Sequence, residues 1–342
     1  MKKLLLLLFS LIFLSFNIQA EPIKLVLHHF YAPSEPSHTD VLIPWAKRVN
    51  ELTDGEVEIR IVGGMALGGK PKDLTTQART GRVDLIWTVN GYSGREFIRT
   101  EVFELPFVHT NNPVATNLAM REMYETDLKE DYKGLEVMFL HATQGHLFQS
   151  KGYAIRKPED LRGKSGRTPS RTGAWTLEEL GAKPVSVPVK RLPQTLQRRA
   201  VSVVMIPFTA NPLLRLQQHV SHMTEGQDQT RFGTVVFQVS MNQKKWNSLS
   251  PKIQAAFREA SDERILRRAG QVWHEDEKRG LDLMLKFKKE HIVLNKEETE
   301  AFEVALRPVT ERWIKDVEKE GIDGRALVKK AKRLIEKYSS ER

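Results

Sequence analysis

The chain after its apolar N-terminal run begins with a strand, helix, strand pattern, and this order restricts the fold more than any other feature of the sequence. Residues 25–30 have the apolar composition of a buried strand. Residues 42–52 place apolar side chains at spacings of three and four, as on a helix that lies on a sheet. Residues 57–61 alternate apolar and charged side chains, as in a second strand. This order favours a parallel strand pair and therefore an α/β fold.

The alternation continues along the chain and predicts two α/β lobes that are joined by hinge crossovers. A chain of 342 residues is long enough to fill two cores of ordinary size. The long helix predicted from residue 251 onward runs for almost forty residues and is expected to span both lobes. The expected segments are residues 21–142 for the first lobe, 143–222 for the second, 223–260 for a return to the first through a strand at 234–241, and 261–342 for the spanning helix and C-terminal helices that pack on both lobes.

The second lobe is predicted to alternate short strands with helices. Its expected strands are residues 153–155, 164–168, 184–187 and 201–206. Residues 208–218 are expected to form one helix. The C-terminal residues 296–320 and 323–338 have amphipathic patterns and predict two more helices.

The N-terminal residues 1–20 have the pattern of an export signal. Two lysines precede an apolar run, and Ala20 is a small residue at the expected cleavage point. A retained membrane anchor is the alternative, but the apolar run is short for a membrane span. We therefore expect cleavage near Ala20, a mature chain that begins at Glu21, and export to the periplasm. The sequence has no cysteine, so neither a lipid anchor on cysteine nor a disulfide is available.

The charge balance favours an anionic ligand. The formal net charge is +10, of which two lysines in residues 1–20 contribute two, leaving +8 on the rest of the chain. A positive field of this size attracts anionic ligands or acidic partner surfaces. Nucleic acid is the competing partner, but the basic residues are spread among 43 acidic ones and form no basic helix with aromatic stacking residues. We therefore expect no nucleic-acid partner.

Arg167 is the strongest single candidate for ligand binding. It lies near the end of the predicted strand 164–168, just before Pro169 and a predicted helix that ends at Gly181. Small ligands of open α/β sheets bind at such strand ends. A guanidinium group matches a carboxylate with two parallel hydrogen bonds. On position alone, a solvated surface arginine is the alternative.

The stretch DLRGKSGRTPSRTGAWTLEELGAKPVSVP, residues 160–188, resembles the solute-binding proteins of TRAP transporters, the DctP type. These proteins have a similar D-L-K-G-x-K-x-R-x-P segment followed by L-G-A-x-P. The resemblance also covers GRVDLIW and FELPF and extends to the C-terminal helices. It implies a two-lobe fold of the periplasmic-binding-protein kind, a small carboxylate ligand, and two integral membrane subunits, one small and one large, as partners.

The resemblance also implies a set of ligand-binding positions. The arginine that clamps the carboxylate falls on Arg167, and two further anion-contacting positions fall on His28 and His146. Positions that are polar in relatives that bind sugar acids fall on aliphatic residues here. The full predicted set is Arg167, His28, His146, Trp87, Val89, Asn90, Tyr92, Arg171, Val189, Ile206 and Phe208. The aliphatic residues among them predict an acid with an apolar or aromatic body, such as an aromatic or branched keto acid.

One stretch departs from the family pattern. The family segment A-L-Q-x-G-x-V-D-G corresponds here to TLQRRAVSV, residues 195–203, so that the aspartate and both glycines are replaced. The strand preference of Val201 and Val203 is retained. The geometry of the turn beside the ligand is therefore the uncertain feature.

Motifs of common enzymes are missing from the sequence. It contains no G-x-S-x-G, S-x-x-K or H-E-x-x-H motif. The histidine pairs His28–His29 and His219–His222 lack further ligands nearby in sequence, so we expect no metal site and no cofactor. The sequence predicts a monomeric binding protein without catalytic residues. Two alternatives remain: a secreted hydrolase or lyase that uses His28 or His146 as a base, and the input domain of a sensor.

Overall fold

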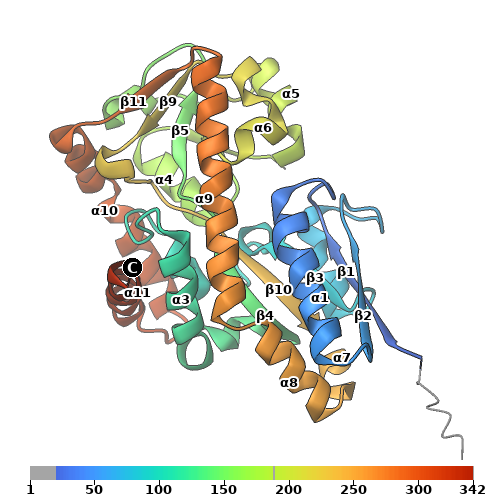
Figure 1. Ribbon diagram of the computed structural model, residues 1–342. Helices are drawn as coiled ribbons and strands as arrows, with labels where there is room; N and C mark the ends of the chain where they lie inside the picture. The colour runs from blue at the N-terminus through green and yellow to red at the C-terminus, as the bar shows by residue number, and fades with distance from the viewer. Residues whose placement is uncertain (1–20, 188, 342) are drawn as a thin grey trace, which may run out of the picture.

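The computed structural model describes residues 21–187 and 189–341, so the predicted export signal lies outside the described residues. Two separate sheets, each flanked by helices, form two lobes, and the long helix α9 (Glu263–Lys286) runs along both of them (Figure 1). This arrangement confirms the predicted two-lobe α/β fold. None of the helices in the described part has the length and apolar character that a membrane span requires.

The first sheet has five strands and contains the parallel pairs predicted from the N-terminal pattern. β1 pairs in parallel with β2 and β3, whereas β10 pairs antiparallel with β3 and β4. The position of β10 between β3 and β4 shows that the chain returns to this sheet after building the second one. In spatial order the strands are β2 (Val57–Val62), β1 (Ile23–His29), β3 (Leu85–Val89), β10 (Val236–Asn242) and β4 (Leu135–Ala142).

Two helices of the first lobe, α3 and α8, begin at residues whose side chains cap them. Asn112 accepts a hydrogen bond from the Ala115 amide at 3.0 Å at the start of α3, and Ser250 accepts one from the Ile253 amide at the start of α8. A proline follows each cap, at the position where a helix needs no amide hydrogen. The helices are α1 (Ile43–Leu52), α2 (Leu74–Arg79), α3 (Pro113–Met123), α7 (Gln243–Ser248) and α8 (Pro251–Ala260).

The second sheet has six strands, with β6 between its parallel neighbours β7 and β8. β5 is antiparallel to β8 and β9, and β11 is parallel to β9. In spatial order the strands are β11 (Glu290–Val293), β9 (His222–Glu225), β5 (Leu147–Ser150), β8 (Val203–Ile206), β6 (Ser165–Thr168) and β7 (Lys183–Ser186). Its helices are α4 (Arg171–Glu179), α5 (Leu192–Gln197), α6 (Ala210–Leu214) and α10 (Lys296–Glu318).

The predicted strand at residues 153–155 is wrong. The strand is β5, which lies a few residues earlier and is buried along its whole length. Its polar residue Gln149 donates a hydrogen bond to Asn211 at 2.9 Å, so a polar composition is compatible with a buried strand. β9 and β11 are short and rich in polar residues, so neither shows the apolar run or the alternation of apolar and polar residues by which a strand is predicted. Because β9 belongs to the second sheet, the return to the first sheet follows residue 225 rather than 223.

Two predicted helices are interrupted. The helix expected at residues 208–218 breaks at Arg215, whose backbone is left-handed with φ 50° and ψ 42°. The helix expected from residue 251 onward consists of α8 and α9, which are separated at Ser261 and Asp262. Asp262 caps α9 by accepting a hydrogen bond from the Arg264 amide at 2.8 Å. A cap inside an amphipathic run is therefore the signal that marks the break.

The two segments that cross between the lobes are bonded to each other. The His146 amide donates to the Gly233 carbonyl at 2.7 Å, and the Phe232 amide donates to the His146 carbonyl at 2.9 Å. The C-terminal helices add further connections, because α10 packs on α4 of the second lobe whereas α11 (Gly324–Ser340) packs on α3 of the first. The lobes are thus joined at several points (Figure 1).

Two glycines allow α9 to approach both lobes closely. A Cβ atom on Gly270 would lie 2.8 Å from the backbone nitrogen of Val114, in the first lobe. A Cβ atom on Gly280 would lie 2.0 Å from the backbone oxygen of Phe208, in the second. Real Cβ atoms do not approach backbone atoms so closely. The close packing of α9 on both lobes therefore depends on these two residues.

We predict that Gly280→Ala destabilises the protein by about 1–3 kcal/mol, because an added methyl group in a packed contact forces the backbone to move. In an exposed helix the change from glycine to alanine stabilises the protein by about 0.5–1 kcal/mol. The contact with Phe208 therefore decides whether Gly280→Ala raises or lowers the free energy of unfolding. Urea denaturation measures the difference. Lys278→Ala on the exposed side of α9 is the matched control and should change little. An unchanged or higher stability of Gly280→Ala would contradict this account of the contact.

Candidate functional site

A small cavity of about 40 Å³ lies between the two lobes, next to the carboxyl ends of β3, β6 and β8. Both lobes and both crossing segments contribute to its wall. Most of the lining side chains are apolar, and a few polar groups face one another across it. The lining residues are Tyr31, Val89, Tyr92, Thr143, His146, Arg167, Pro169, Val189, Ile206, Pro207, Thr209, Ala210, Val235 and Phe237.

Arg167 brings a positive charge to this cavity. Its side chain comes from β6 and is only 2% exposed. The Nε group donates to the Val187 carbonyl at 3.1 Å, whereas Nη2 has no hydrogen-bond partner among the described residues. No carboxylate within the described part of the chain forms an ion pair with this guanidinium. Burial lowers the pKa of Arg167, but an arginine remains protonated in proteins.

A second buried arginine has the carboxylate partners that a buried positive charge normally requires. Arg231, in the crossing segment before β10, is equally buried, and its Nη2 lies 2.7 Å from a Glu225 oxygen and 3.1 Å from a Glu277 oxygen. Buried charges are normally paired in this way because an unpaired charge loses its hydration without compensation. In contrast, no described carboxylate neutralises the charge of Arg167.

Two tyrosines lie beside the Arg167 guanidinium. Burial raises the pKa of Tyr92, and a hydrogen bond with Arg167 opposes this shift. Burial also raises the pKa of Tyr31, and the positive charge of Arg167 again acts in the opposite direction. Both hydroxyl groups are therefore protonated donors at neutral pH. Together with Arg167 they form a group of donors suited to a carboxylate.

His146 is a further polar residue of the wall, together with Thr143 and Thr209. Burial and the charge of Arg167 lower the pKa of His146 to about 3, so its ring is neutral at physiological pH. A neutral imidazole has one donor and one acceptor nitrogen. It therefore contributes a directional hydrogen bond rather than a second positive charge.

The structure brings six of the eleven predicted residues to the cavity and leaves five outside it. Those at the cavity are Arg167, His146, Val89, Tyr92, Val189 and Ile206. Among those outside, His28 faces α2, where its Nδ1 lies 2.7 Å from Gln77 Oε1. Asn90 is occupied by Tyr132 and Gln238, each at 2.8 Å.

The other three residues outside the cavity support its surroundings. Arg171 Nε donates to Glu101 at 3.0 Å, and its Nη1 donates to Asp316 at 2.6 Å. Trp87 lies behind the wall and stacks on Phe237 with ring centroids 5.0 Å apart. Phe208 packs under Arg231, whose guanidinium lies 5.3 Å from the ring centroid.

Sequence reasoning missed the residues that follow strand ends by a few positions. Tyr31 lies three residues after His28, in the loop that leaves β1, and it reaches the cavity that His28 does not. Phe237 comes from β10. Its place at the cavity depends on which strands pair with β10, and the sequence alone does not give this pairing. For His28, the sequence did contain a warning. Side chains alternate along a strand, so His28 and its neighbour His29 must face opposite sides of the sheet.

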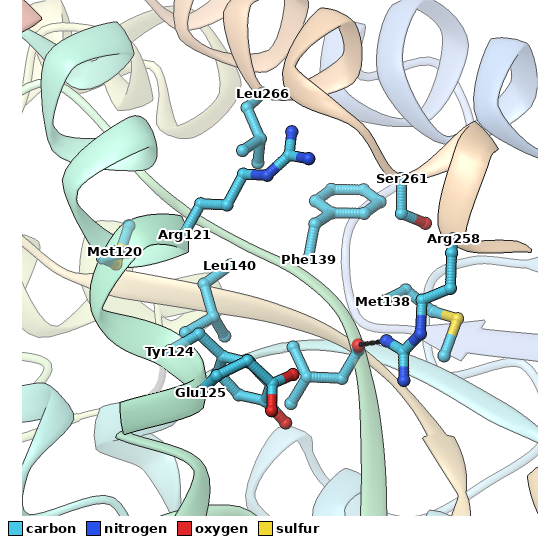
Figure 2. A pocket seen from close by; sticks show the side chains of 11 residues that line it. Met120, Arg121, Tyr124, Glu125, Met138, Phe139, Leu140, Arg258, Ser261 and Leu266 are labelled. Atoms are coloured by element: carbon cyan, nitrogen blue, oxygen red, sulfur yellow. Dashed lines mark hydrogen bonds between the residues drawn. The ribbon is translucent and has the colours of Figure 1, made fainter. Parts of the chain in front are cut away.

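A larger hollow of about 260 Å³ lies elsewhere, between α3, β4 and the junction of α8 with α9, and shares no residue with the cavity (Figure 2). Its floor includes Phe139 and Leu140. Arg258 donates to the Val137 carbonyl at 3.2 Å and also pairs with Glu136. Because this hollow presents no buried unpaired charge, it is a weaker candidate despite its size. In the described part of the chain, no three metal-ligating side chains gather closely enough to hold a metal ion.

Comparison with known proteins places the chain in a family. Residues 27–316 match the model of "Bacterial extracellular solute-binding protein, family 7", also called DctP. The chain belongs to this family. The match covers most of the sequence, including both lobes, the crossing segments and the cavity residues.

Solved structures of TRAP solute-binding proteins have the same fold as this family 7 protein. One from Rhodoferax ferrireducens, in complex with copurified benzoate, is 28% identical, covers 93% of this chain and 99% of its own, and has a TM-score of 0.88. One from a marine metagenome, specific for aromatic acids and complexed with 3-hydroxybenzoate, is 30% identical with coverage of 93% and 99% and a TM-score of 0.88. One from Chromohalobacter salexigens with bound D-glucuronate is 19% identical with coverage of 91% and 99% and a TM-score of 0.78, which shows the shared fold alone.

Glu104 joins the lobes next to the cavity of this family 7 protein. It lies at the end of the short 3-10 helix Thr100–Glu104, and its carboxyl accepts from the Val236 amide at 3.1 Å and from the Thr172 hydroxyl at 3.4 Å. Burial, with a smaller contribution from the nearby charge of Glu101, raises the pKa of Glu104 to about 8. Glu104 is therefore mostly protonated at neutral pH and links β10 to α4 as a neutral group.

We predict that Glu104 contributes a fall in stability as pH rises from about 4.5 to about 8, because the unfolded state releases the Glu104 proton in this range while the folded state retains it. Buried neutral histidines such as His146, with a pKa of about 3, contribute the opposite slope below about pH 6.5, so the net fall is expected between pH 7 and 8. Each such group contributes a slope of about 1.4 kcal/mol per pH unit. Glu277, with a pKa of about 7, adds to the fall below pH 7. Glu104→Gln should remove its own share, most clearly between pH 7 and 8.

Urea denaturation at pH 5, 6, 7 and 8 measures this slope. Glu303→Gln, an exposed change on α10, is the matched control and should keep the wild-type slope. The pKa assignment of Glu104 fails if Glu104→Gln shows the same fall in stability above pH 7 as the wild type.

Proposed function

We propose that this protein is the extracytoplasmic receptor of a TRAP-type secondary transporter and that it binds a small carboxylic acid with an aromatic or apolar body. The observation that carries the proposal is the buried guanidinium of Arg167, which faces the interlobe cavity without a carboxylate partner among the described residues. A bound carboxylate supplies that partner. The two tyrosine hydroxyls beside it add donors to the same anion.

The apolar wall supports an aromatic or aliphatic ligand body. Val89, Val189 and Ile206 offer no hydrogen bonds to hydroxyl groups, and Phe237 offers a ring face. A sugar acid would have to bury hydroxyl groups against these side chains, and each unsatisfied hydroxyl costs about 1–3 kcal/mol. The relatives whose structures contain benzoate and 3-hydroxybenzoate favour the same choice.

Ligand entry requires the lobes to separate. A cavity of about 40 Å³ holds only a few water molecules, since each occupies about 10–15 Å³ on this measure. An aromatic acid therefore enters an opened form, and the lobes close around it. Hinge closure of this kind removes water from the bound carboxylate and strengthens its interaction with Arg167.

The receptor function is favoured over catalysis by the surroundings of the histidines. His28 lies away from the cavity and is held by Gln77. His146 lines the cavity, but among the described residues no carboxylate orients its ring, as a general base would require. The family 7 relatives described above are solute-binding receptors.

We also propose that residues 1–20 are removed on export, that the mature protein is a monomer in the periplasm, and that it delivers its ligand to one small and one large membrane subunit. The apolar N-terminal run and the family support export. Intact mass of the exported protein should begin at Glu21. A membrane-bound full-length chain would overturn this part of the proposal.

A thermal-shift screen of organic acids tests the function. Benzoate, hydroxybenzoates, mandelate and branched keto acids should raise the melting temperature in a concentration-dependent way, because a ligand that binds only the folded state stabilises it. Glucuronate and galacturonate should raise it little. The proposed ligand class is wrong if the uronates stabilise the protein more than the aromatic and keto acids do, and the receptor function is wrong if no carboxylate stabilises it.

We predict that Arg167→Ala nearly abolishes binding of the preferred acid. Loss of one partner from a buried ion pair costs about 2–5 kcal/mol, which is a loss of about 30-fold to a few thousand-fold in affinity. Arg167→Lys should also weaken binding, because an ammonium group replaces two parallel hydrogen bonds by a point charge. Isothermal titration calorimetry measures both effects.

Arg325→Lys is the control, since Arg325 pairs with Glu311 on the exposed surface. Its affinity for the ligand should equal that of the wild type. If Arg167→Ala binds the acid within about threefold of the wild type, the contribution is no greater than that of an exposed pair, and the carboxylate assignment fails.

A further inference from the structure

A second space of about 350 Å³ adjoins the cavity and is here called the outer chamber. Tyr31 and Val189 line both spaces and therefore form the partition between them. The other residues of the outer chamber come from the loop after β1 and from the region around α5 and α6. They are Ala32, Lys190, Pro193, Leu213, Leu214, Arg215, Gln218 and His219.

The outer chamber carries positive charge without a counter-charge. Neither Lys190 nor Arg215 forms an ion pair with any described residue, and no aspartate or glutamate is among the residues that line the space. The charge of Glu35 is near enough to raise the pKa of Tyr31, but Glu35 does not line the chamber. Burial lowers the pKa of His219, so the fixed charge comes from Lys190 and Arg215.

The two spaces adjoin each other, and only together do they offer both the Arg167 guanidinium and the volume that a small ligand needs. Ligand pockets commonly measure about 300–1,000 Å³, and the cavity at Arg167 is far smaller than this. A ring attached to a carboxylate on Arg167 needs more space than this cavity offers, and the outer chamber adjoins the cavity at Tyr31 and Val189. The far end of the ring then points into the outer chamber, toward Lys190 and Arg215.

We propose that the outer chamber is a subsite for a second acidic group and that the preferred ligand is an aromatic acid with two anionic groups at opposite ends of its body. This inference rests on the proposed receptor function and narrows its ligand class. Arg167 fixes the first carboxylate in the closed cavity. Lys190 and Arg215 receive the second anionic group in the wetter outer chamber.

The charge pattern makes a dianion a sensitive probe. If the second anionic group had no cationic subsite, it would lose hydration near an apolar wall, and a dianion would bind more weakly than the monoanion with the same ring. Lys190 and Arg215 are exposed, and with the subsite two exposed charge pairs together raise affinity by up to about tenfold. The sign of the difference between the two ligands therefore decides the question.

Calorimetric titration with benzoate, benzene-1,3-dicarboxylate and benzene-1,4-dicarboxylate tests the proposal. At least one dicarboxylate should bind the wild type about tenfold more tightly than benzoate. The variant Lys190→Gln/Arg215→Gln should lose this advantage and keep the affinity for benzoate within about twofold. Raising the ionic strength should reduce the advantage in the wild type, because exposed charges are screened.

Arg198→Gln is the matched control, since Arg198 is an exposed arginine at the end of α5 that does not line the chamber. It should retain the full preference for the dicarboxylate. If both dicarboxylates bind no more tightly than benzoate, or if the preference survives in the double variant, the inference is wrong while the receptor function stands. If neither benzoate nor any other carboxylate binds, the receptor function itself is wrong.

Discussion

The buried charge of Arg167 is the constraint on which the site depends. Taking a guanidinium group out of water without a counter-ion costs several kcal/mol, and the fold has to supply that energy from packing elsewhere. Arg231, equally buried, has Glu225 and Glu277 as partners. The chain can therefore build a neutralised arginine, whereas Arg167 of β6 has no carboxylate partner among the described residues. A charge in this state favours any anion that the lobes enclose, so specificity has to come from the apolar wall.

The lobes are held near each other by contacts that do not involve the ligand. Arg171 in α4 connects Glu101 of the first lobe with Asp316 of α10. Gly91 of the first lobe lies so close to Ser170 of the second that an added Cβ would be 2.9 Å from the serine Cβ. Such contacts stabilise the closed arrangement before a ligand arrives. A ligand then only needs to shift an existing equilibrium by its differential affinity for the closed state.

Sequence patterns predicted the strands and helices in which apolar side chains are buried and polar side chains are exposed. They failed where a polar side chain is buried and hydrogen-bonded inside a lobe. The strand, helix, strand order of residues 25–61 was predicted correctly because, in each of these elements, the spacing of the apolar residues matches the buried face of the element. β5 was missed because Gln149 is paired with Asn211 inside the lobe. Arg167 could be found from its place at a strand end, whereas Phe237 depends on β10 lying beside β3, a pairing between residues far apart in the chain. No local signal contains that information.

The departure at residues 195–203 shows how a turn can survive the loss of its glycine. The family pattern has glycine where this chain has Arg199, and the backbone there keeps a positive φ of 57°. The Arg199 amide donates to the Leu196 carbonyl at 3.1 Å and the Ala200 amide to the Thr195 carbonyl at 3.0 Å, which is the double hydrogen bond of a Schellman motif. An arginine in this conformation costs about 1–2 kcal/mol relative to glycine. The hydrogen bonds, together with the fully buried Val203 that follows, oppose this cost and hold β8 in place. The wall formed by Ile206 is therefore kept although the residues of the turn have changed.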